Sequence, residues 1–377
     1  MPTVKILIIG GGSSGLSMAG ALKQYGLDAT ILDQDSATGD VWRKRYQRLH
    51  LHTIKGLSHS AYKKMDDDLP RYVAKDDFAD YLRDYATALD LDIRHNCTVT
   101  RITKTDDGYQ VKTENGDTWQ AQQLIIATGV NRVPFIPKWE GIEQYQGTLM
   151  HAASHQTGAD YAGERVLVVG IGNSGAEISA DCAENGASLV TNSVRTFPTI
   201  VKRDMLGIPV HVWGVVLFPF PTAFKDWLVN IMSKIELGDL SPYGIQAPEW
   251  NIFKDKQIPM IDVGYVAQLK NGNIHVKPDI AHFTQTGVQF VDGSQQDYDR
   301  VIAATGYRTG LEKILDIPNV IDDEGNVIAV NGADAPHQGL WFIGLLSSPA
   351  GVLMAARVQS RRFAKQIAHF YQIATTI

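Results

Sequence analysis

Two stretches of the chain share one pattern of apolar and polar positions. Each begins with a short apolar run, at residues 5–9 and 165–169, and continues into a glycine-rich turn. Apolar residues then recur at helical spacing, and each stretch ends in a further apolar run, at residues 28–33 and 187–191. This order predicts two strand–helix–strand units that begin about 160 residues apart.

The segments outside these two units have other patterns. Residues 71–90 alternate apolar and charged positions as a helix does, and a closing helix is predicted from 351 to 371. Turn signals at Asp107-Gly108 and Asn115-Gly116 divide residues 96–128 into three predicted strands.

The sequence Ala-Thr-Gly ends a predicted strand at two places, residues 127–129 and 304–306. Small residues at these positions would let the chain cross from one domain to the other. We therefore predict an α/β fold of two Rossmann-like dinucleotide-binding domains, the first of them discontinuous. The predicted ranges are 1–155 with 285–377 for the first domain, 156–284 for the second, and 205–255 for an apolar substrate or dimer segment within it.

Composition then excludes several classes. The 377 residues carry a net charge of −6, so the basic excess of a nucleic-acid surface is missing. The two cysteines, Cys97 and Cys182, form no Cys-x-x-Cys pair, which argues against thioredoxin-type dithiol chemistry. At 20% charged and 44% hydrophobic residues, the chain resembles an ordinary globular protein.

The longest apolar and aromatic run, residues 205–220, is interrupted by Pro209, His211 and Pro219 and is shorter than a membrane-spanning helix. We expect a buried or interdomain segment here, with peripheral membrane contact as the alternative. Because no secretory signal pattern precedes the first glycines, we expect a cytoplasmic protein.

The first glycine-rich turn reads Gly10-x-Gly12-x-x-Gly15. In this fingerprint the first glycine makes the turn, the second admits a pyrophosphate, and the third lets the helix pack on the strand. Asp33 ends the following strand, where a carboxylate accepts hydrogen bonds from ribose hydroxyls.

The second turn reads Gly170-x-Gly172-x-x-Gly175, and no carboxylate stands at the end of its next strand. Ser193 and Arg195 stand there instead, and a hydroxyl with a guanidinium suits a 2′-phosphate. This difference predicts NADPH at the second site and a different dinucleotide, FAD, at the first. A solvated arginine on a loop is the alternative for Arg195.

At these motifs the sequence resembles the class B flavin-containing monooxygenases, and most closely their plant YUCCA-type branch. The resemblance extends to Gly39-Asp-Val-Trp42, to residues 45–53, to residues 237–264 and to Ala304-Thr-Gly-Tyr307. The family's identifying motif is present as Tyr145-x-Gly147-x-x-x-His151-x-x-x-His155, in which His155 replaces the usual aromatic residue.

The resemblance implies an NADPH-dependent enzyme that reduces FAD and forms a C4a-(hydro)peroxide with O2. One oxygen atom would then pass to a small organic substrate: an amine, a sulfide, an indole or a 2-oxo acid. The protein's part would be to position the reactants and to exclude water. The fingerprints, linkers and resemblance together predict as cofactor-binding residues Gly10, Gly12, Ser14, Gly15, Asp33, Trp42, His52, Thr53, Thr128, Gly129, Gly170, Gly172, Asn173, Ser174, Gly175, Ser193, Arg195, Thr305, Gly306 and Tyr307.

Two further residues are candidates for a chemical role. His52 is expected beside the flavin, where an imidazole could hydrogen-bond the oxygen adduct or the nicotinamide, unless it only packs there. Lys254 would lie near the substrate entrance and attract a carboxylate, with a plain surface lysine equally compatible. His151 is expected to be structural, and no metal site is expected because no carboxylate or cysteine joins the histidines at ligand spacing.

Two other functions stay open. The same fold and cofactors would serve an NADPH-dependent flavoprotein reductase that performs no oxygenation. A flavoprotein that senses redox state through a partner is the non-enzymatic alternative. The expected partners are a small-molecule substrate and O2, with no nucleic acid, no stable membrane insertion and a possible homodimer.

Overall fold

The computed structural model describes residues 1–322, 325–328, 337–345 and 351–374. The chain divides into two compact units, each described here by itself. Residues 1–44, 53–133 and 307–377 form the first unit, and residues 45–52 and 134–306 form the second. None of the helices in the described part of the chain combines the length and apolar character that a membrane crossing requires.

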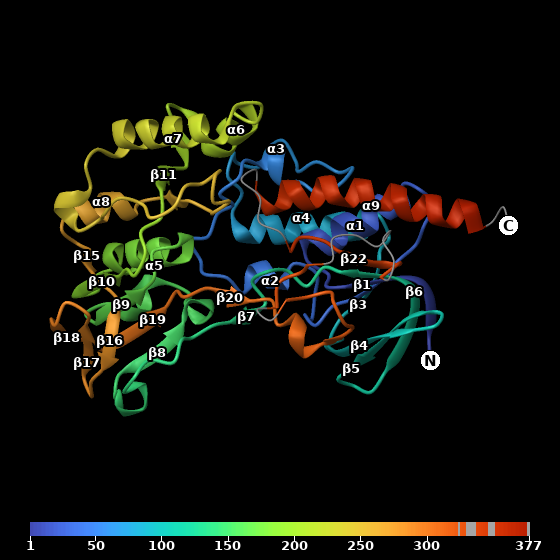
Figure 1. Ribbon diagram of the computed structural model, residues 1–377, viewed down its shortest axis with the longest axis horizontal. Helices are drawn as coiled ribbons and strands as arrows, with labels where there is room; N and C mark the ends of the chain where they lie inside the picture. The colour runs from blue at the N-terminus through green and yellow to red at the C-terminus, as the bar shows by residue number, and fades with distance from the viewer. Residues whose placement is uncertain (323–324, 329–336, 346–350, 375–377) are drawn as a thin grey trace. The chain divides into compact units, whose positions relative to one another are not determined.

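The first unit is built on an eight-stranded mixed sheet (Figure 1). Its order is β21-β4-β5-β6-β1-β2-β3, with β22 also paired to β6. Its elements are β1 Thr3–Ile9, α1 Ser13–Lys23, β2 Thr30–Leu32, α2 Asp40–Arg43, α3 Lys55–Ser58, α4 Lys75–Ala88, β3 Asp92–Arg94, β4 Val99–Thr105, β5 Gly108–Thr113, β6 Thr118–Ile126, β20 Tyr307–Arg308, β21 Leu315–Asp316, β22 Leu340–Phe342 and α9 Val352–Ala374. The chain leaves this unit through β7, Val133–Pro134.

The apolar runs predicted as strands form the interior of this sheet. In β1, residues Ile6 to Ile9 are all buried, because β1 pairs in parallel with β2 on one side and β6 on the other. The three strands expected within 96–128 are the antiparallel meander β4-β5-β6, and the predicted helices at 71–90 and 351–371 are α4 and α9. Helices α1 and α9 pack side by side on the sheet (Figure 1).

The second unit has an all-parallel five-stranded sheet in the order β15-β10-β9-β19-β8. A small antiparallel sheet, β16-β17-β18, accompanies it. The elements are β8 Thr148–His151, β9 Arg165–Val169, α5 Asn173–Glu184, β10 Leu189–Ser193, β11 Ile200–Lys202, β12 Asp204–Met205, β13 Ile208–Pro209, α6 Val210–Val216, α7 Thr222–Leu237, β14 Met260–Asp262, α8 Tyr265–Lys270, β15 His275–Lys277, β16 Ile280–Phe283, β17 Gly287–Phe290, β18 Gln295–Asp297 and β19 Arg300–Ala303.

The chain passes from one compact unit to the other a few residues after the first Ala-Thr-Gly linker, at 133/134, and directly after the second, at 306/307, whereas the predicted boundaries were 155/156 and 284/285. The difference has a physical cause. Strands β8 and β19, expected in the first domain, pair in parallel with each other, and β19 pairs with β9 at the centre of the second sheet. Residues 45–52 also belong to the second unit.

The α/β fold with two Rossmann-like units is confirmed. The expectation of a buried segment at 205–220 is only half right. Met205 and Leu217 are buried, but Leu206, Val216 and Phe218 are exposed.

Candidate functional site: two nucleotide-binding turns

The first glycine-rich turn joins β1 to α1. Gly10 has a φ of 107°, which L side chains rarely adopt, and its N–H donates to the Leu32 carbonyl at 2.8 Å. A Cβ on Gly15 would lie 1.9 Å from the Gly10 carbonyl oxygen, so only glycine allows the helix this close to the turn. A Cβ on Gly12, in contrast, would meet no atom within 4 Å. The turn is therefore open at the glycine where a pyrophosphate is expected to approach.

Asp33 lies just beyond β2 and is buried. Its side chain lies against Gly11, where a Cβ would come within 2.4 Å of Asp33 Oδ2. Burial raises the pKa of Asp33, while a hydrogen bond from the Asp35 N–H opposes this rise. Thr128 Oγ1, at the first linker, is buried with no hydrogen-bond partner in the described residues. An acceptor beside the turn and an unsatisfied hydroxyl fit a dinucleotide with ribose and phosphate oxygens.

The other predicted residues of this unit have various surroundings. Ser14 is buried in the first turn of α1, and Gly129 has a φ of 77° at the end of the linker. Trp42 is half-buried and packs edge-on against Phe78, with ring centroids 4.8 Å apart. The Thr53 hydroxyl is buried against that of Ser58, and Tyr307 begins β20.

The second glycine-rich turn joins β9 to α5 with nearly the same backbone. Gly170 has a φ of 103°, and its N–H donates to the Ser193 carbonyl at 2.8 Å. A Cβ on Gly175 would lie 2.1 Å from the Gly170 oxygen, and a Cβ on Gly172 would meet nothing within 4 Å. This turn therefore also fits a dinucleotide.

The residue equivalent to Asp33 in the second unit is Val194. Asp33 N–H donates to the last residue of β3, and Val194 N–H donates in the same way to Lys277, the last residue of β15. Val194 is buried and apolar, so the position held by the Asp33 carboxylate in the first unit carries no carboxylate here. Arg195 follows and is exposed.

Three predicted residues of the second unit have partners within the protein. The Ser193 hydroxyl is buried and donates to the Pro278 carbonyl at 2.8 Å, so it does not face solvent as a phosphate ligand would. Asn173 Oδ1 accepts from the Ile261 N–H at 2.7 Å and fixes the start of α5 to β14. The Thr305 hydroxyl donates to the Phe135 carbonyl.

The histidine of the family motif also has a structural place. His151 is buried at the end of β8, and its Nε2 lies 2.9 Å from the Gly306 carbonyl. Its Nδ1 accepts from the Ala153 N–H at 3.0 Å, so Nε2 carries the proton and donates to Gly306. Burial lowers the pKa of His151. These contacts tie β8 to the second linker and leave neither ring nitrogen free to act as a base.

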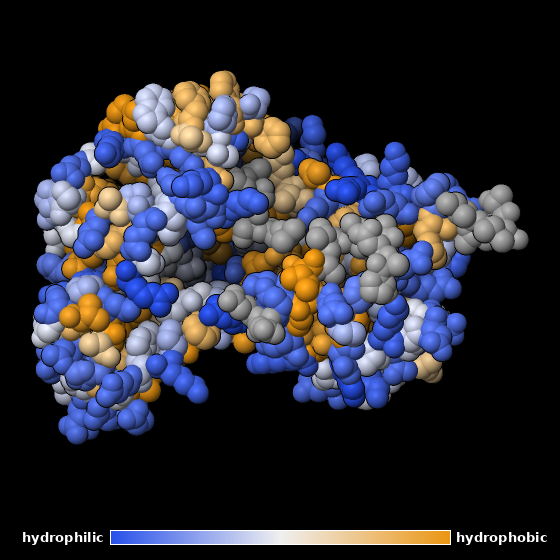
Figure 2. Space-filling view, in the orientation of Figure 1, coloured by the Kyte–Doolittle hydropathy of each residue, from blue (hydrophilic) through white to orange (hydrophobic). Residues whose placement is uncertain are grey.

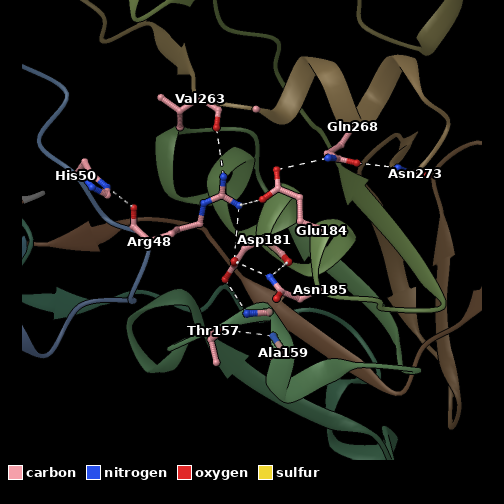
Figure 3. Close-up of polar contacts among 12 residues, drawn as sticks. Arg48, His50, Thr157, Ala159, Asp181, Glu184, Asn185, Val263, Gln268 and Asn273 are labelled. Atoms are coloured by element: carbon pink, nitrogen blue, oxygen red, sulfur yellow. Dashed lines mark hydrogen bonds and ion pairs between the residues drawn. The ribbon is translucent and has the colours of Figure 1, made fainter. Parts of the chain in front are cut away.

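Residues 45–52 contact helix α5 through Arg48, which forms ion pairs with acidic side chains of the helix (Figure 3). Glu177, Asp181 and Glu184 share one face of the helix, at positions i, i+4 and i+7. Arg48 Nη1 lies 3.0 Å from Glu184 and 3.6 Å from Asp181, and Arg48 Nη2 donates to the Val263 carbonyl (Figure 3). The segment that carries His52 is thus fastened to the helix that follows the second glycine-rich turn.

His52 lies over the first turns of this helix. Its Nε2 is 3.0 Å from Glu177 Oε1, within ion-pair distance, and Glu177 is 2% exposed. His52 Nδ1 and His211 Nδ1 are both buried with no hydrogen-bond partner in the described residues. Burial, reinforced by the neighbouring His52, lowers the pKa of His211 to about 4. Burial and the charge of Glu177 raise the pKa of Tyr46.

This polar group of His52, Glu177 and His211 contains two residues that the sequence analysis missed. The signal for Glu177 was the acidic spacing along α5, but nothing in the sequence pairs that spacing with residues 45–52. Unsatisfied buried nitrogens are rare in folded proteins, and a catalytic role or a bound water or ion is among the explanations for one. The group therefore marks a polar site beside helix α5, close to the second glycine-rich turn.

The remaining candidates lie elsewhere. Lys254 is exposed, and its backbone N–H donates to Asp226 at 3.0 Å. His155 is fully buried, with Nε2 3.0 Å from Asp181 and Nδ1 3.2 Å from the Tyr161 hydroxyl, so it replaces an aromatic residue as a packed, hydrogen-bonded ring. Among the described residues, no group of three or more His, Cys, Asp or Glu side chains could hold a metal ion.

Comparison with known proteins identifies the family. A family model described as pyridine nucleotide-disulphide oxidoreductase matches residues 7–204. The indole-3-pyruvate monooxygenase YUCCA8 of Oryza sativa subsp. indica is 32% identical over 380 residues, which cover 93% of this chain and 89% of that protein. The chain belongs to the YUCCA-type branch of the flavin-containing monooxygenases.

Solved structures agree on the fold of the enzyme. A flavin-containing monooxygenase from Stenotrophomonas maltophilia has a TM-score of 0.77 at 24% identity, covering 98% of this chain and 99% of its own. OTEMO, solved in complex with FAD and NADP, has a TM-score of 0.77 at 18% identity, covering 99% of this chain and 87% of its own. Both therefore share the fold of this chain over nearly its whole length.

The cysteines separate the enzyme from the disulphide chemistry in the family model's description. Both are unpaired, and they lie in different units, Cys97 in the first and Cys182 in the second. Burial raises the pKa of Cys182 to about 12. No dithiol is therefore available to accept electrons.

Proposed function

We propose that the chain is an FAD-dependent, NADPH-using monooxygenase that inserts one oxygen atom from O2 into a small organic substrate. The observation that carries this proposal is the pair of matching glycine-rich turns with different ribose surroundings, in a chain of the YUCCA-type branch. OTEMO, which has the same fold, binds FAD and NADP together. Bound FAD supplies the redox chemistry, accepting a hydride from the nicotinamide and passing electrons to O2.

We assign one cofactor to each unit from the residues that surround its glycine-rich turn. FAD is assigned to the first unit, where Asp33 would accept hydrogen bonds from ribose hydroxyls and the α1 N-terminus would face the pyrophosphate. NADPH is assigned to the second unit, where the exposed Arg195 would bind the 2′-phosphate. Ser193 is left out of this assignment, since its hydroxyl donates to Pro278.

The protein's own contribution to the reaction lies in the polar group. Glu177 Oε1 lies 3.0 Å from His52 Nε2, and His52 Nδ1 is buried without a hydrogen-bond partner in the described residues. That nitrogen would accept a hydrogen bond from the nicotinamide amide or hold a proton needed when oxygen is transferred. The low pKa of His211 keeps this neighbouring ring neutral at pH 7. Lys254 remains a candidate for attracting a substrate carboxylate, because its side chain is exposed to solvent.

The substrate class we favour is a 2-oxo acid, because YUCCA8 is an indole-3-pyruvate monooxygenase. The balanced reaction would convert R-CO-COOH, O2, NADPH and H⁺ to R-COOH, CO2, NADP⁺ and water. An amine, sulfide or indole would instead gain one oxygen atom without losing carbon.

The test uses the purified protein loaded with FAD, supplied with NADPH and 18O2, and offered 2-oxo acids, sulfides, amines and indole in turn. One class is expected to accelerate NADPH consumption and to yield a product that carries one 18O atom. The proposal fails if every class leaves oxygen to appear only as H2O2 while a quinone or ferricyanide is reduced. That result would identify a flavoprotein reductase, and absence of any NADPH oxidation would favour a redox sensor.

We also propose a cytoplasmic location and a homodimer. Two unpaired cysteines and no disulfide fit a reducing compartment. Cell fractionation with an epitope-tagged chain tests the location, and recovery in a membrane or secreted fraction would contradict it.

A further inference from the structure

Helix α9 carries a pair of arginines near its start, outside the core of the first unit. Hydrophilic side chains cover much of this helix in Figure 2, and α3 lies beside its first turns (Figure 1). Ala356 and Ser360 are buried, and Ser360 Oγ lies 3.0 Å from Ser17 Oγ of α1. Arg357 and Arg361 each follow one of these buried residues, so they are neighbours at positions i and i+4. Like charges at this spacing destabilise a helix, so an anion beside them would be stabilising.

The partners of the two arginines are uncharged. Arg357 Nη1 donates to the Gly56 carbonyl at 3.4 Å and to His59 Nε2. The Arg361 guanidinium lies over the Tyr62 ring, 4.8 Å from its centre. Burial and the charge of Arg361 lower the pKa of Arg357, as happens to a cation whose charge no carboxylate balances. Among the described residues, no carboxylate lies within ion-pair distance of either arginine.

His59 holds the Arg357 guanidinium in one orientation. Its Nδ1 lies 2.8 Å from the Ser60 carbonyl and therefore carries the proton, since a carbonyl only accepts. Its Nε2 is then the acceptor for Arg357 Nη1. Burial lowers the pKa of His59, and the charges of Arg357 and Arg361 act in the same direction, so the ring is neutral at pH 7. In the part of the chain that the structure describes, no hydrogen bond engages Arg357 Nη2 or Nε, so this edge is left for a ligand.

The loop that follows α3 is held against α4. The Ser60 N–H donates to the Tyr81 hydroxyl at 2.8 Å, and this hydroxyl donates to the Lys63 carbonyl at 2.7 Å. Tyr62, between them, has a φ of 67°, a left-handed conformation that a non-glycine residue keeps only where its surroundings enforce it. In this conformation the Tyr62 ring lies against Arg361. The groups that contact the arginines are therefore fixed before any ligand binds.

The free edge of Arg357 suits an anion with two oxygens in one plane. A guanidinium offers two parallel N–H groups, which match the oxygens of a carboxylate or of a phosphate. Lys64 is exposed and adds a third positive charge near His59, so the cluster is cationic in a chain of net charge −6. In the proposed reaction the phosphates of FAD are assigned to the turn at Gly12. The anion that remains is the carboxylate of a 2-oxo acid.

We propose that Arg357 and Arg361 form a site for the carboxylate of the substrate and that His59 positions the Arg357 guanidinium. The choice of a carboxylate rests on the proposed function, whereas the anion site rests on the contacts of the arginines themselves. Arg357 Nη2 and Nε would face the two carboxylate oxygens, and Arg361 would add its charge. The enzyme would thus distinguish a 2-oxo acid from an analogue that lacks the acid group.

The first test measures binding without turnover, by titration calorimetry of the FAD-loaded protein. The ligands are hydrocinnamate, which is phenylpyruvate without its keto oxygen, and its uncharged amide. The wild type is expected to bind the carboxylate at least ~10-fold more tightly than the amide, and Arg357→Met should abolish this preference. Arg357→Lys should keep part of it, because the charge remains without the two-pronged hydrogen bonding. The matched control is Arg362→Met, at an exposed arginine of the same helix, which should behave as the wild type.

The second test separates positioning from structural support at His59. His59→Ala should reduce the preference for the carboxylate by ~3-fold and leave the affinity for the amide unchanged, because only the orientation of Arg357 is lost. His59→Gln, whose side-chain oxygen can accept from Arg357, should restore most of the preference. Equal weakening of both ligands, or loss of flavin absorbance in His59→Ala, would overturn the positioning role.

Three results would overturn the site. Arg357→Met could bind hydrocinnamate as tightly as the wild type. Inorganic phosphate could displace hydrocinnamate from the wild type while Arg357→Met, folded by circular dichroism, lacks flavin, which would assign the arginine to a phosphate of the cofactor. Loss of the preference in Lys254→Met, with Arg357→Met unchanged, would assign the carboxylate to Lys254.

Oxygenation is assayed separately from binding, so the two proposals can fail independently. If no 2-oxo acid is oxygenated, the proposed function fails. A preference for hydrocinnamate that is lost in Arg357→Met and weakened in Arg361→Met would still support the anion site.

Discussion

Gly10 in the first unit and Gly170 in the second have φ angles of 107° and 103°, and each donates its N–H to the end of the next strand at 2.8 Å. A Cβ on the third glycine of each motif would also lie very close to this first glycine, 1.9 Å from the Gly10 carbonyl oxygen and 2.1 Å from the Gly170 carbonyl oxygen. The residue after that next strand differs completely: Asp33 in one unit, Val194 in the other. The backbone of a nucleotide-binding turn is thus fixed by glycines, and we propose that the choice of nucleotide depends on side chains outside it.

The largest expected effects come from the third glycines. Gly15→Ala should yield protein without flavin, and Gly175→Ala should keep flavin but bind NADPH at least ~100-fold more weakly, since each new Cβ would displace its helix by overpacking. Flavin absorbance of the purified protein and NADPH titration measure the two losses.

Gly56→Ala is the matched control, because a Cβ there meets nothing within 4 Å and its φ is not positive. It should bind both cofactors normally. Loss of the same cofactor from both fingerprint variants would contradict the separate assignments.

The two units should respond oppositely to acid. His211, in the second unit, has its pKa lowered from 6.5 to about 4 by burial, so the stability it contributes is present above pH 6.5 and is lost as the pH falls towards 4. The loss amounts to ~3 kcal/mol over that interval. Asp33, in the first unit, has a raised pKa, so its effect has the other sign: stability is gained as the pH falls through its folded pKa.

Urea unfolding of the apoprotein between pH 7 and pH 4 measures this contrast. Relative to the wild type, His211→Gln should flatten the decline in the free energy of unfolding, and Asp33→Asn should raise that free energy most at pH 7. Identical pH profiles for the wild type and His211→Gln would show that His211 is not buried in its neutral form.

The nucleotide preference sharpens the comparison further. Arg195→Ala should raise the KM for NADPH by about 10-fold or more and change the KM for NADH less than about twofold, since only NADPH presents a 2′-phosphate. Arg195→Lys should fall between, because a lysine keeps the charge but not the two-pronged hydrogen bonding. Equal changes for both nucleotides would reject the assignment.

The smallest effect is expected at the polar group of the second unit. His52→Ala should increase H2O2 released per NADPH consumed by a few-fold, and Glu177→Gln should do so less, because it loosens His52 without removing it. His50→Ala is the control, since His50 is exposed and contacts only the same segment's Arg48 carbonyl among the hydrogen bonds described. An unchanged ratio in His52→Ala would reject the role.

The sequence predicted the two turns well because their cause is local. Glycine spacing, the flanking apolar runs and Asp33 are all contained within about 25 residues, and the structure has the expected strand, turn and helix at each. The absence of a carboxylate in the second unit could be read in the same way, and Val194 now holds that position.

The features that were missed depend on distant contacts. Residues 45–52 join the second unit because Arg48 and His52 meet the acidic face of α5, more than 120 residues away, and no local pattern encodes that pairing. Ser193 has the right place in the sequence, but its hydroxyl already donates a hydrogen bond to the Pro278 carbonyl. In α7, Lys225 and Asp226 are buried while Phe224 and Trp227 are exposed, the reverse of what side-chain polarity alone predicts.

The two cysteine thiols also affect how well the enzyme tolerates any peroxide that it releases. Peroxide attacks the thiolate form of cysteine. Burial raises the pKa of both thiols, that of Cys182 to about 12, so Cys182 stays protonated at pH 7. Any peroxide that escapes during turnover therefore finds almost no thiolate, and the enzyme should resist inactivation by its own leakage.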